Sequence, residues 1–181
     1  MRGRWIGAVV AALLLAGVSL PVLRDRSAEA AGVCDAKTKP ANLDFTLKDM
    51  AGKDVKLASF RGKVIVLDFW ATWCGPCKIE IPGFVDFNNR YKSQGLVVIG
   101  VSVDDSLEML KPYLKDYRAK NGHDMNYPIL LGKDRDDIQE AYGPIWGLPT
   151  TYLIGRDGKL CKKHMGLAGK EQFEREIKAL L

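Results

Sequence analysis

Residues 69–84 read FWATWCGPCKIEIPGF and place Cys74 and Cys77 on either side of a Gly-Pro dipeptide. Residues 64–70, VIVLDFW, form a short apolar run rich in β-branched side chains, a pattern typical of a buried central strand. Residues 75–92 predict a helix that is kinked or broken at Pro82. The chain is therefore expected to pass from a central strand into a cysteine pair that opens a helix.

The rest of the chain predicts an α/β fold around this unit. Further strands are expected at 42–47 and 55–57 (a hairpin), 96–102, 127–131, 150–154 and 159–165, and further helices at 106–120, 136–142 and 169–181. Strands and helices alternate, and the order ends in a hairpin and a helix. This order predicts a mixed central sheet with helices on both faces.

The N-terminus has the pattern of an export segment. Two arginines in residues 1–4 precede an uncharged apolar run from Trp5 to Leu23, and Ala28-Glu29-Ala30 offers a cleavage site. The run is also long enough for an uncleaved membrane anchor. Residues 1–30 are thus expected to be a signal peptide or an anchor, 31–40 a linker and 41–181 the domain. Both versions export the domain, because the basic end stays in the cytoplasm.

Composition and cysteine content narrow the range of possible functions further. The 181 residues carry a formal net charge of +5, with no basic run interleaved with aromatics, so nucleic acid binding is not indicated. Four cysteines in an exported chain allow stable disulfides. Cys34 and Cys161 remain beside the Cys74–Cys77 pair. They could join in a disulfide, or Cys161 could be a buried thiol and Cys34 a free one, since sequence does not give connectivity.

The close cysteine pair fits electron exchange better than metal binding or reinforcement. Structural zinc needs four ligands, and the two histidines, His123 and His164, lie far apart, so no metal is predicted. As a purely structural disulfide, the Cys74–Cys77 bond would close a very short loop, so it would restrain the unfolded chain little. Cys74 at a helix start is stabilised as a thiolate, which is the attacking species. We therefore expect Cys74 to be the exposed nucleophile and Cys77 the shielded resolving thiol.

The residues around the pair resemble a known family. These are residues 64–77, 45–49, 59–63, 80–82, 98–104 and 147–154. Together they are similar to the TlpA/ResA-like thiol–disulfide oxidoreductases of the thioredoxin superfamily, related to the AhpC/TSA redoxin domains. The resemblance covers residues 41–181. It implies a thioredoxin fold with an N-terminal β-hairpin and an insertion at about 103–126.

The resemblance also implies a setting. Such proteins work in the bacterial periplasm without an organic cofactor or metal, and they receive electrons from a membrane-embedded donor. Implied substrates are exported protein thiols or disulfides, among them apocytochrome c, copper-site assembly proteins and misbridged exported proteins. Cytochrome c biogenesis and exported-protein redox homeostasis are therefore the expected processes.

Two acids are candidate catalytic residues. Asp68 lies in the apolar strand, where burial raises a carboxyl pKa and suits it to exchange a proton with Cys77. Alternatively it ends the strand and faces water. At this position the sequence resembles thioredoxin, whereas many TlpA/ResA-like proteins carry Asn there. Glu80 lies three residues beyond Cys77 on the same helix face. The resemblance implies that Glu80 is a second acid near the sulfurs. Alternatively, its negative charge only stabilises the start of the helix.

Five residues are expected to bind substrate: Trp73, Gly75, Pro76, Leu148 and Pro149. By resemblance the Leu148–Pro149 bond is cis and lies against Cys74, which leaves the Leu148 backbone to pair with an extended substrate segment. The alternative is an ordinary trans proline in a loop. Trp73, Pro76 and Trp146 are expected to wall the groove, and Trp70 is expected in the core.

The predicted function is an exported thiol–disulfide oxidoreductase. Its Gly-Pro dipeptide is that of thioredoxin, which is strongly reducing at about −270 mV, so a reductant is expected. A thiol peroxidase is a rival, since the start of the domain also resembles peroxiredoxins, but those lack a second thiol three residues on. The other rival is a metallochaperone that holds Cu(I) between the two thiolates. No Met-rich or His-rich surface tract supports it.

Overall fold

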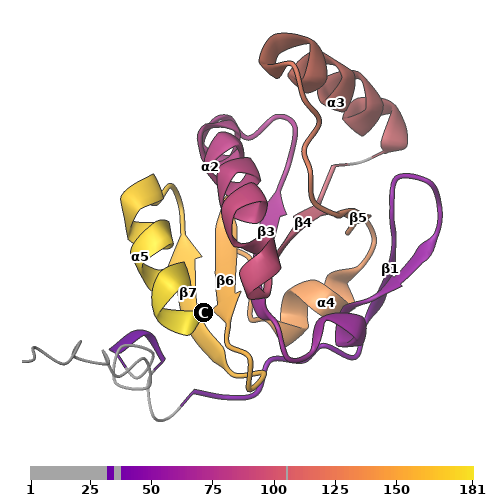
Figure 1. Cartoon of the computed structure of the whole chain (residues 1–181). Coiled ribbons are helices and arrows are strands. Elements are labelled where there is room, and N and C mark those ends of the chain that lie inside the picture. Colours follow the sequence, from indigo (N-terminus) through magenta and orange to yellow (C-terminus); the bar gives the residue numbers. More distant parts are fainter. Residues whose placement is uncertain (1–31, 35–37, 105) are drawn as a thin grey trace, which may run out of the picture.

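The computed structural model describes residues 32–34, 38–104 and 106–181 (Figure 1). The expected signal or anchor at 1–30 lies outside these residues. The elements in chain order are β1 (Thr46–Lys48), β2 (Asp54–Lys56), η1 (Leu57–Phe60), β3 (Val64–Trp70), α2 (Gly75–Tyr91), η2 (Lys92–Gln94), β4 (Leu96–Ser102), α3 (Leu107–Asn121), β5 (Ile129–Leu131), α4 (Asp136–Ala141), β6 (Thr150–Ile154), β7 (Leu160–Met165) and α5 (Lys170–Leu180). Within the described part of the chain, no helix has the length and apolar character needed to cross a bilayer.

The main sheet has five strands in the order β5-β4-β3-β6-β7. Strand β4 runs parallel to both β3 and β5, whereas β6 runs antiparallel to β3 and β7, so the mixed sheet is confirmed. All seven residues of β3 are buried, as the apolar run predicts for a central strand. In the register, Asp68 lies opposite Gly100 of β4 and Thr151 of β6.

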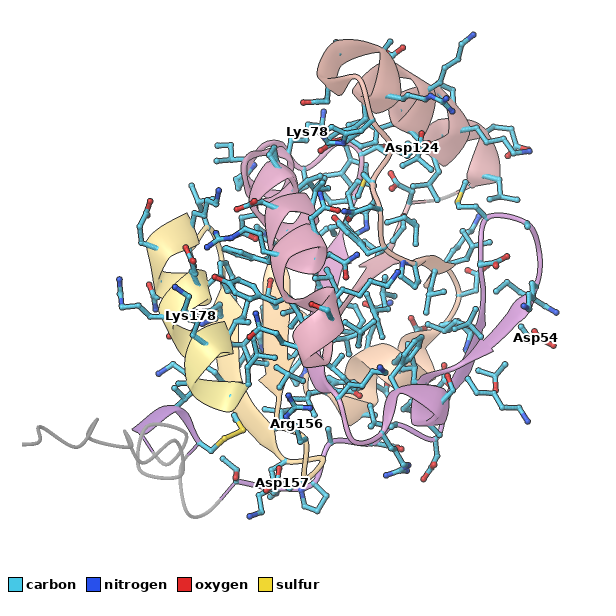
Figure 2. The ribbon with its side chains drawn as sticks, in the orientation of Figure 1. Asp54, Lys78, Asp124, Arg156, Asp157 and Lys178 are labelled. Carbon is cyan, nitrogen blue, oxygen red and sulfur yellow. A yellow bond between two sulfur atoms is a disulfide. The ribbon has the colours of Figure 1, made fainter. Side chains whose placement is uncertain are left out.

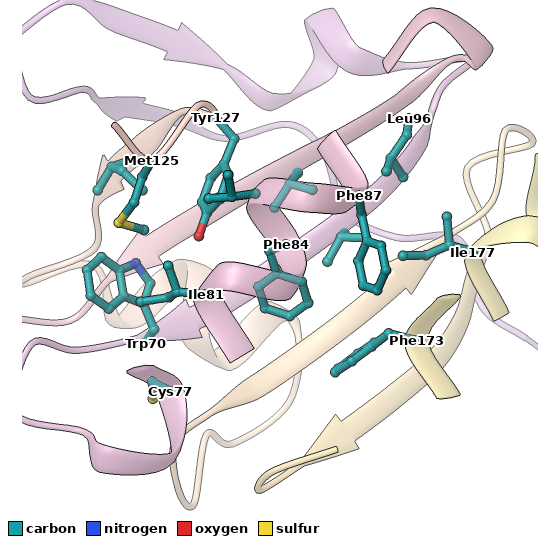
Figure 3. Close-up of a cluster of buried hydrophobic side chains, with 14 of the residues drawn as sticks. Trp70, Cys77, Ile81, Phe84, Phe87, Leu96, Met125, Tyr127, Phe173 and Ile177 are labelled. Atoms are coloured by element: carbon teal, nitrogen blue, oxygen red, sulfur yellow. The ribbon is translucent and has the colours of Figure 1, made fainter. Parts of the chain in front are cut away.

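Alternate residues of β3 face two separate cores. Val64, Val66 and Trp70 pack in the cluster that α2 and α5 cover, with Phe84 and Phe173 among its members (Figure 3). Ile65, Leu67 and Phe69 pack on the other face with Leu47 of β1 and Ile138 of α4. The period of two along β3 therefore gives each face its own apolar layer. Helices cover both faces, as expected.

Two local details differ from the sequence expectations. In the hairpin, β1 is only three residues long, half the length expected at 42–47, whereas β2 has the expected three residues and begins one position earlier. Helix α2 continues through Pro82, so of the kink or break expected there the break does not occur. Proline removes one helical hydrogen bond, but Ile81 and Phe84 on either side of it are buried in the core and hold both halves of the helix against the sheet.

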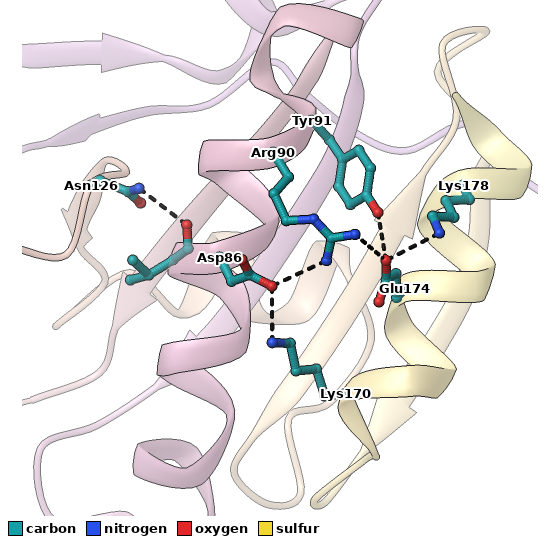
Figure 4. A network of polar contacts seen from close by, with 8 residues as sticks. Asp86, Arg90, Tyr91, Asn126, Lys170, Glu174 and Lys178 are labelled. Carbon is teal, nitrogen blue, oxygen red and sulfur yellow. Dashed lines mark hydrogen bonds and ion pairs between the residues drawn. The ribbon is translucent and has the colours of Figure 1, made fainter.

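Polar contacts join α2 to α5 on the surface (Figure 4). Glu174 Oε1 accepts from the Tyr91 hydroxyl at 2.5 Å and from Arg90 Nη2 at 2.7 Å. The same oxygen lies 3.1 Å from Lys178 Nζ. Asp86 links Arg90 of its own helix to Lys170 at the start of α5, at 3.2 and 2.9 Å. These bonds fix the two helices that flank the buried cluster.

Candidate active site

The cysteine pair stands where β3 passes into α2. The Cys74 N–H donates to the Ala71 carbonyl at 3.1 Å, which closes a turn between strand and helix. Cys74 is the N-cap residue of α2, and its Sγ accepts the Cys77 backbone N–H at 3.2 Å. Pro76 lies in the first turn, where the missing N–H has no cost. The chain thus aims a free helix-start N–H at the first sulfur.

The two sulfurs form a disulfide with a Cα–Cα distance of 5.3 Å. Cys74 is 5% exposed and Cys77 is 1% exposed. Cys74 is therefore the more accessible of the two, yet in this oxidised state it is less exposed than the sequence suggested. Both sulfurs belong to the buried cluster under α2, which withdraws them from solvent. Figure 3 shows Cys77 beside Trp70 and Ile81.

Asp68 is buried inside the sheet, at 2% exposure. Its Oδ1 accepts a hydrogen bond from the Thr151 hydroxyl at 3.1 Å. Burial, and to a lesser degree the charge of Glu80, raises the pKa of Asp68 to about 8, against the lowering effect of the Thr151 bond. The acid in the strand does not face water, so this carboxyl carries a proton at neutral pH.

Glu80 is also buried, one turn along α2 from Cys77. Its Oε1 accepts the Ala168 N–H at 2.7 Å, from the loop before α5. Oε2 is buried without a hydrogen-bond partner in the described structure. Burial raises the pKa of Glu80 to about 7, although the Ala168 bond lowers it. Glu80 borders a cavity of about 430 Å³ that Pro82, Leu167 and Phe173 also line.

The expected groove residues are exposed. Trp73 is 63% and Trp146 81% exposed, and Gly75 and Pro76 are exposed at the helix start. The Leu148–Pro149 bond is cis, the form that the resemblance implies. Leu148 is half-buried, and Pro149 is buried with its carbonyl accepting the Gly166 N–H at 2.8 Å. Trp70 lies fully in the core, as expected.

Sequence reasoning missed the acid that holds the active-site turn. Asp104 follows β4 and is 3% exposed. Its carboxylate accepts the Thr72 N–H at 2.9–3.0 Å and the Thr72 hydroxyl at 2.5 Å. The available signal was an acid placed directly after the buried strand at 96–102, since the ends of neighbouring parallel strands meet at one edge of a sheet.

The remaining cysteines form a second disulfide. Cys34 and Cys161 are joined across 127 residues of sequence, which is the pairing that the sequence left open. Pro40 forms an isolated bridge with Lys159 nearby, so parts of the expected linker 31–40 are fixed to the start of β7. In Figure 2 this bond lies near Arg156 and Asp157, while Lys78, next to the Cys74–Cys77 pair, lies at the opposite end of the molecule.

Neither histidine joins a metal-ligand cluster in the described residues. No group of three or more His, Cys, Asp or Glu side chains is found there. His164 is almost fully buried, and its Nε2 lies 2.6 Å from Glu176 Oε2. His164 of β7 thus packs inward against α5.

The fold and the cysteine pair together place the chain among the thioredoxin-fold dithiol–disulfide proteins. Comparison with known proteins narrows this class. The sequence pattern of the AhpC/TSA family matches residues 37–163. Thiol-disulfide oxidoreductase ResA of Geobacillus thermodenitrificans is 31% identical over 172 residues, 95% of this chain and 92% of the relative. ResA of Bacillus thuringiensis is 34% identical over 137 residues, 76% and 75% of the two chains.

A solved structure agrees with these relatives. The thiol:disulfide interchange protein of the thioredoxin family from Chlorobium tepidum has a TM-score of 0.68 and 30% identity, over 81% of this chain and 99% of that one. The chain therefore belongs to the AhpC/TSA family, with ResA-like thiol–disulfide oxidoreductases as its relatives. The predicted fold and the predicted enzyme class, a thioredoxin-like thiol–disulfide oxidoreductase, are both confirmed.

Proposed function

We propose that the protein is an exported reductant of protein disulfides, with Cys74 as nucleophile and Cys77 as resolving thiol. The observation that carries this assignment is the Cys77 N–H on the Cys74 sulfur at the first turn of α2. A helix-start N–H and the helix dipole stabilise a thiolate at Cys74 in the reduced protein. The Cys77 sulfur sits deeper, where it reacts only with a disulfide formed on Cys74.

The reaction is a two-step exchange. The Cys74 thiolate attacks one sulfur of a substrate disulfide, the substrate bond breaks, and the leaving sulfur takes up a proton. Cys77 then gives up its proton and attacks the Cys74 sulfur, which releases the second substrate thiol. Two electrons pass to the substrate, and the protein is left with the Cys74–Cys77 disulfide present in this structure. A dithiol donor must reduce that disulfide for another cycle.

Asp68 and Glu80 are proposed to serve the proton step. Cys77 must lose a proton before it attacks, and an acid whose pKa lies near neutrality can accept it. The pKa values of about 8 and about 7 put both carboxyls in this range. Because the charge of Glu80 adds to the cost of ionising Asp68, Asp68 holds its proton near neutral pH and Glu80 can take one from the thiol.

The exposed residues around the pair are proposed to hold the substrate polypeptide. Trp73, next to Cys74, and Trp146, in the loop before Pro149, both expose most of their side chains to solvent. Gly75 and Pro76 add little side-chain bulk to this surface, so a substrate segment can approach the cysteines. The backbone of Leu148, before Pro149, is proposed to pair with an extended substrate segment in the manner of an added strand.

The place of work is proposed to be the bacterial periplasm, with the N-terminal segment cleaved or retained as an anchor. Support comes from the basic and apolar pattern of residues 1–23 and from the Cys34–Cys161 bond, because such bonds persist outside the cytoplasm. A membrane-embedded dithiol donor and exported substrates such as apocytochrome c fit this setting.

A trapping experiment tests the proposal. Cys77→Ala leaves Cys74 unable to release a bound substrate, so mixed disulfides should accumulate on Cys74 in the exported compartment and be identified by mass spectrometry. The matched control, Cys74→Ser with Cys77→Ala, should capture none. The purified wild type should reduce insulin disulfides with a thiol donor, and Cys74→Ser should lose this activity. An empty trap together with unreduced insulin would refute the assignment.

A further inference from the structure

Asp104 occupies an unusual place for an acid. It is nearly fully buried in the loop after β4, and three hydrogen atoms point at its carboxylate. Thr72 supplies two of them, its N–H shared between both oxygens and its hydroxyl on Oδ1. The Ser102 hydroxyl supplies the third, to Oδ2 at 2.7 Å. No cation of the described structure lies within ion-pair distance of Asp104, so neutral donors alone hold it.

These bonds fix the turn that carries the nucleophile. Thr72 stands two residues before Cys74, and the Cys74 N–H closes the turn on Ala71. The same loop holds the other end of the turn, since the Val103 N–H donates to the Trp70 carbonyl at 2.9 Å. The turn between β3 and α2 therefore depends on the residues after β4 for its backbone partners.

We propose that Asp104 is a positioning residue for Cys74, which fixes the Ala71–Cys74 turn so that the Cys74 sulfur stays on the Cys77 N–H. This inference rests on the proposed nucleophilic role of Cys74. A carboxylate suits the task because its two oxygens accept all three donors. An amide has one oxygen and an NH₂ group that would face a donor, so Asn at this position leaves at least one donor without an acceptor.

The position of Asp104 and its negative charge have opposite effects on the pKa of the Cys74 thiol. A negative charge near a thiol raises its pKa, so removing charge alone would lower the Cys74 pKa. Loosening the turn takes the sulfur away from the Cys77 N–H, which raises that pKa. The direction of the change in Asp104→Asn therefore separates positioning from simple electrostatics.

The test measures the Cys74 pKa from the pH dependence of iodoacetamide alkylation. It uses the Cys77→Ala background, which keeps the backbone N–H at position 77 and leaves Cys74 as the free thiol beside an intact Cys34–Cys161 bond. Asp104→Asn should raise the pKa by about half a unit to one unit, which is about three- to tenfold less thiolate at low pH. Asp116→Asn, an exposed acid on α3, is the matched control and should leave it unchanged.

Two further variants keep the test decisive if Asp104→Asn folds poorly. Thr72→Val keeps the Asp104 charge and the Thr72 N–H and removes only the hydroxyl, so it should also raise the Cys74 pKa. Thr72→Ser restores the hydroxyl and should return the value to that of the parent. A pKa that falls in Asp104→Asn, or stays fixed in both Asp104→Asn and Thr72→Val, would overturn the inference.

Turnover separates this inference from the proposed function. With Cys77 present, Asp104→Asn should lower kcat for insulin reduction and leave KM close to that of the wild type, because Asp104 is buried and does not face an incoming substrate. If Cys74→Ser retained insulin reduction, the proposed function would fail. The alkylation results would still decide whether Asp104 holds the turn.

Discussion

Asp68 is a carboxyl group in a strand whose other residues are apolar and whose seven positions are all buried. Its pKa of about 8 in the fold lies far above the value of about 3.9 in an unfolded chain. Between these values the folded protein holds a proton that the unfolded chain has released. Stability therefore falls as the pH rises from about 4 to about 8.

Asp68→Asn should remove this dependence. At pH 8 we expect the variant to be more stable than the wild type by roughly 3 kcal/mol, taking half of the pKa displacement. At pH 4 the two proteins should be similar, because Asp68 is then protonated in the fold and about half protonated in the unfolded chain. Urea unfolding of the oxidised proteins at both pH values checks this. Asp116→Asn is the control, and a gain that is equal at the two pH values would contradict the expectation.

Individual residues of the site differ in how far the sequence alone could predict their roles. Asp68 could be found because an acid interrupts an apolar run, and Cys74 and Cys77 because of their spacing. Asp104 left only the signal of an acid just beyond a buried strand; its contact with Thr72 could not be predicted, because Thr72 lies 32 residues away and the two meet only through the parallel pairing of β3 and β4. The Ala168 bond to Glu80 spans 88 residues and was hidden for the same reason.

At the scale of elements, α2 and α5 are held together by a cluster of charges around Glu174. Three donors on Glu174 lower its pKa to about 2, with the Tyr91 hydroxyl as the largest contribution. A carboxyl whose pKa is lowered in the fold adds stability above its unfolded value, about 4.3. That stability is lost as the pH falls toward 2. The pair of helices should therefore be sensitive to acid.

Glu174→Gln should weaken the protein at pH 7 by about 1 kcal/mol, since the side chain is partly exposed and solvent screens its ion pairs. At pH 2 the difference should shrink, because about half of the folded wild-type molecules then carry a protonated Glu174. Urea unfolding at the two pH values gives the comparison. Glu140→Gln, an exposed acid on α4, is the control and should change stability by less than about 0.5 kcal/mol. An equal loss at both pH values would argue against this account.

The elements themselves were largely predictable, because their periodicity is local. The helix at 75–92 ends one residue earlier in the structure, and the strand at 96–102 has the expected bounds. The break at Pro82 was wrong because propensity does not include the packing of Ile81 and Phe84. The length of β1 also depends on tertiary contacts.

At the scale of the whole molecule, the alternation of strands and helices was enough to predict a mixed sheet covered on both faces. The pairing of Cys34 with Cys161 was not predictable, since four cysteines permit several connectivities. That bond encloses most of the domain. In the chain-entropy account a loop of about 100 residues adds about 4–5 kcal/mol.

Removal of this bond by Cys34→Ser with Cys161→Ser should lower the free energy of unfolding by about 2–5 kcal/mol. Guanidinium unfolding of the purified proteins measures it. The matched control is Cys74→Ser with Cys77→Ser, which opens only a very short loop and should change stability much less. In the Cys77→Ala background the alkylation rate of Cys74 should stay the same, because the second bond lies at the far end of the molecule. Equal losses in the two double variants would contradict the loop argument.

The position of the Cys34–Cys161 bond has a consequence for a membrane-bound form. The bond of Cys34 to Cys161 lies near Asp157. A hydrophobic segment upstream would therefore attach the domain to the membrane by the end opposite the Cys74–Cys77 pair. Trp73, next to Cys74, would then face the aqueous space, and incoming polypeptides could reach it without competing with lipid.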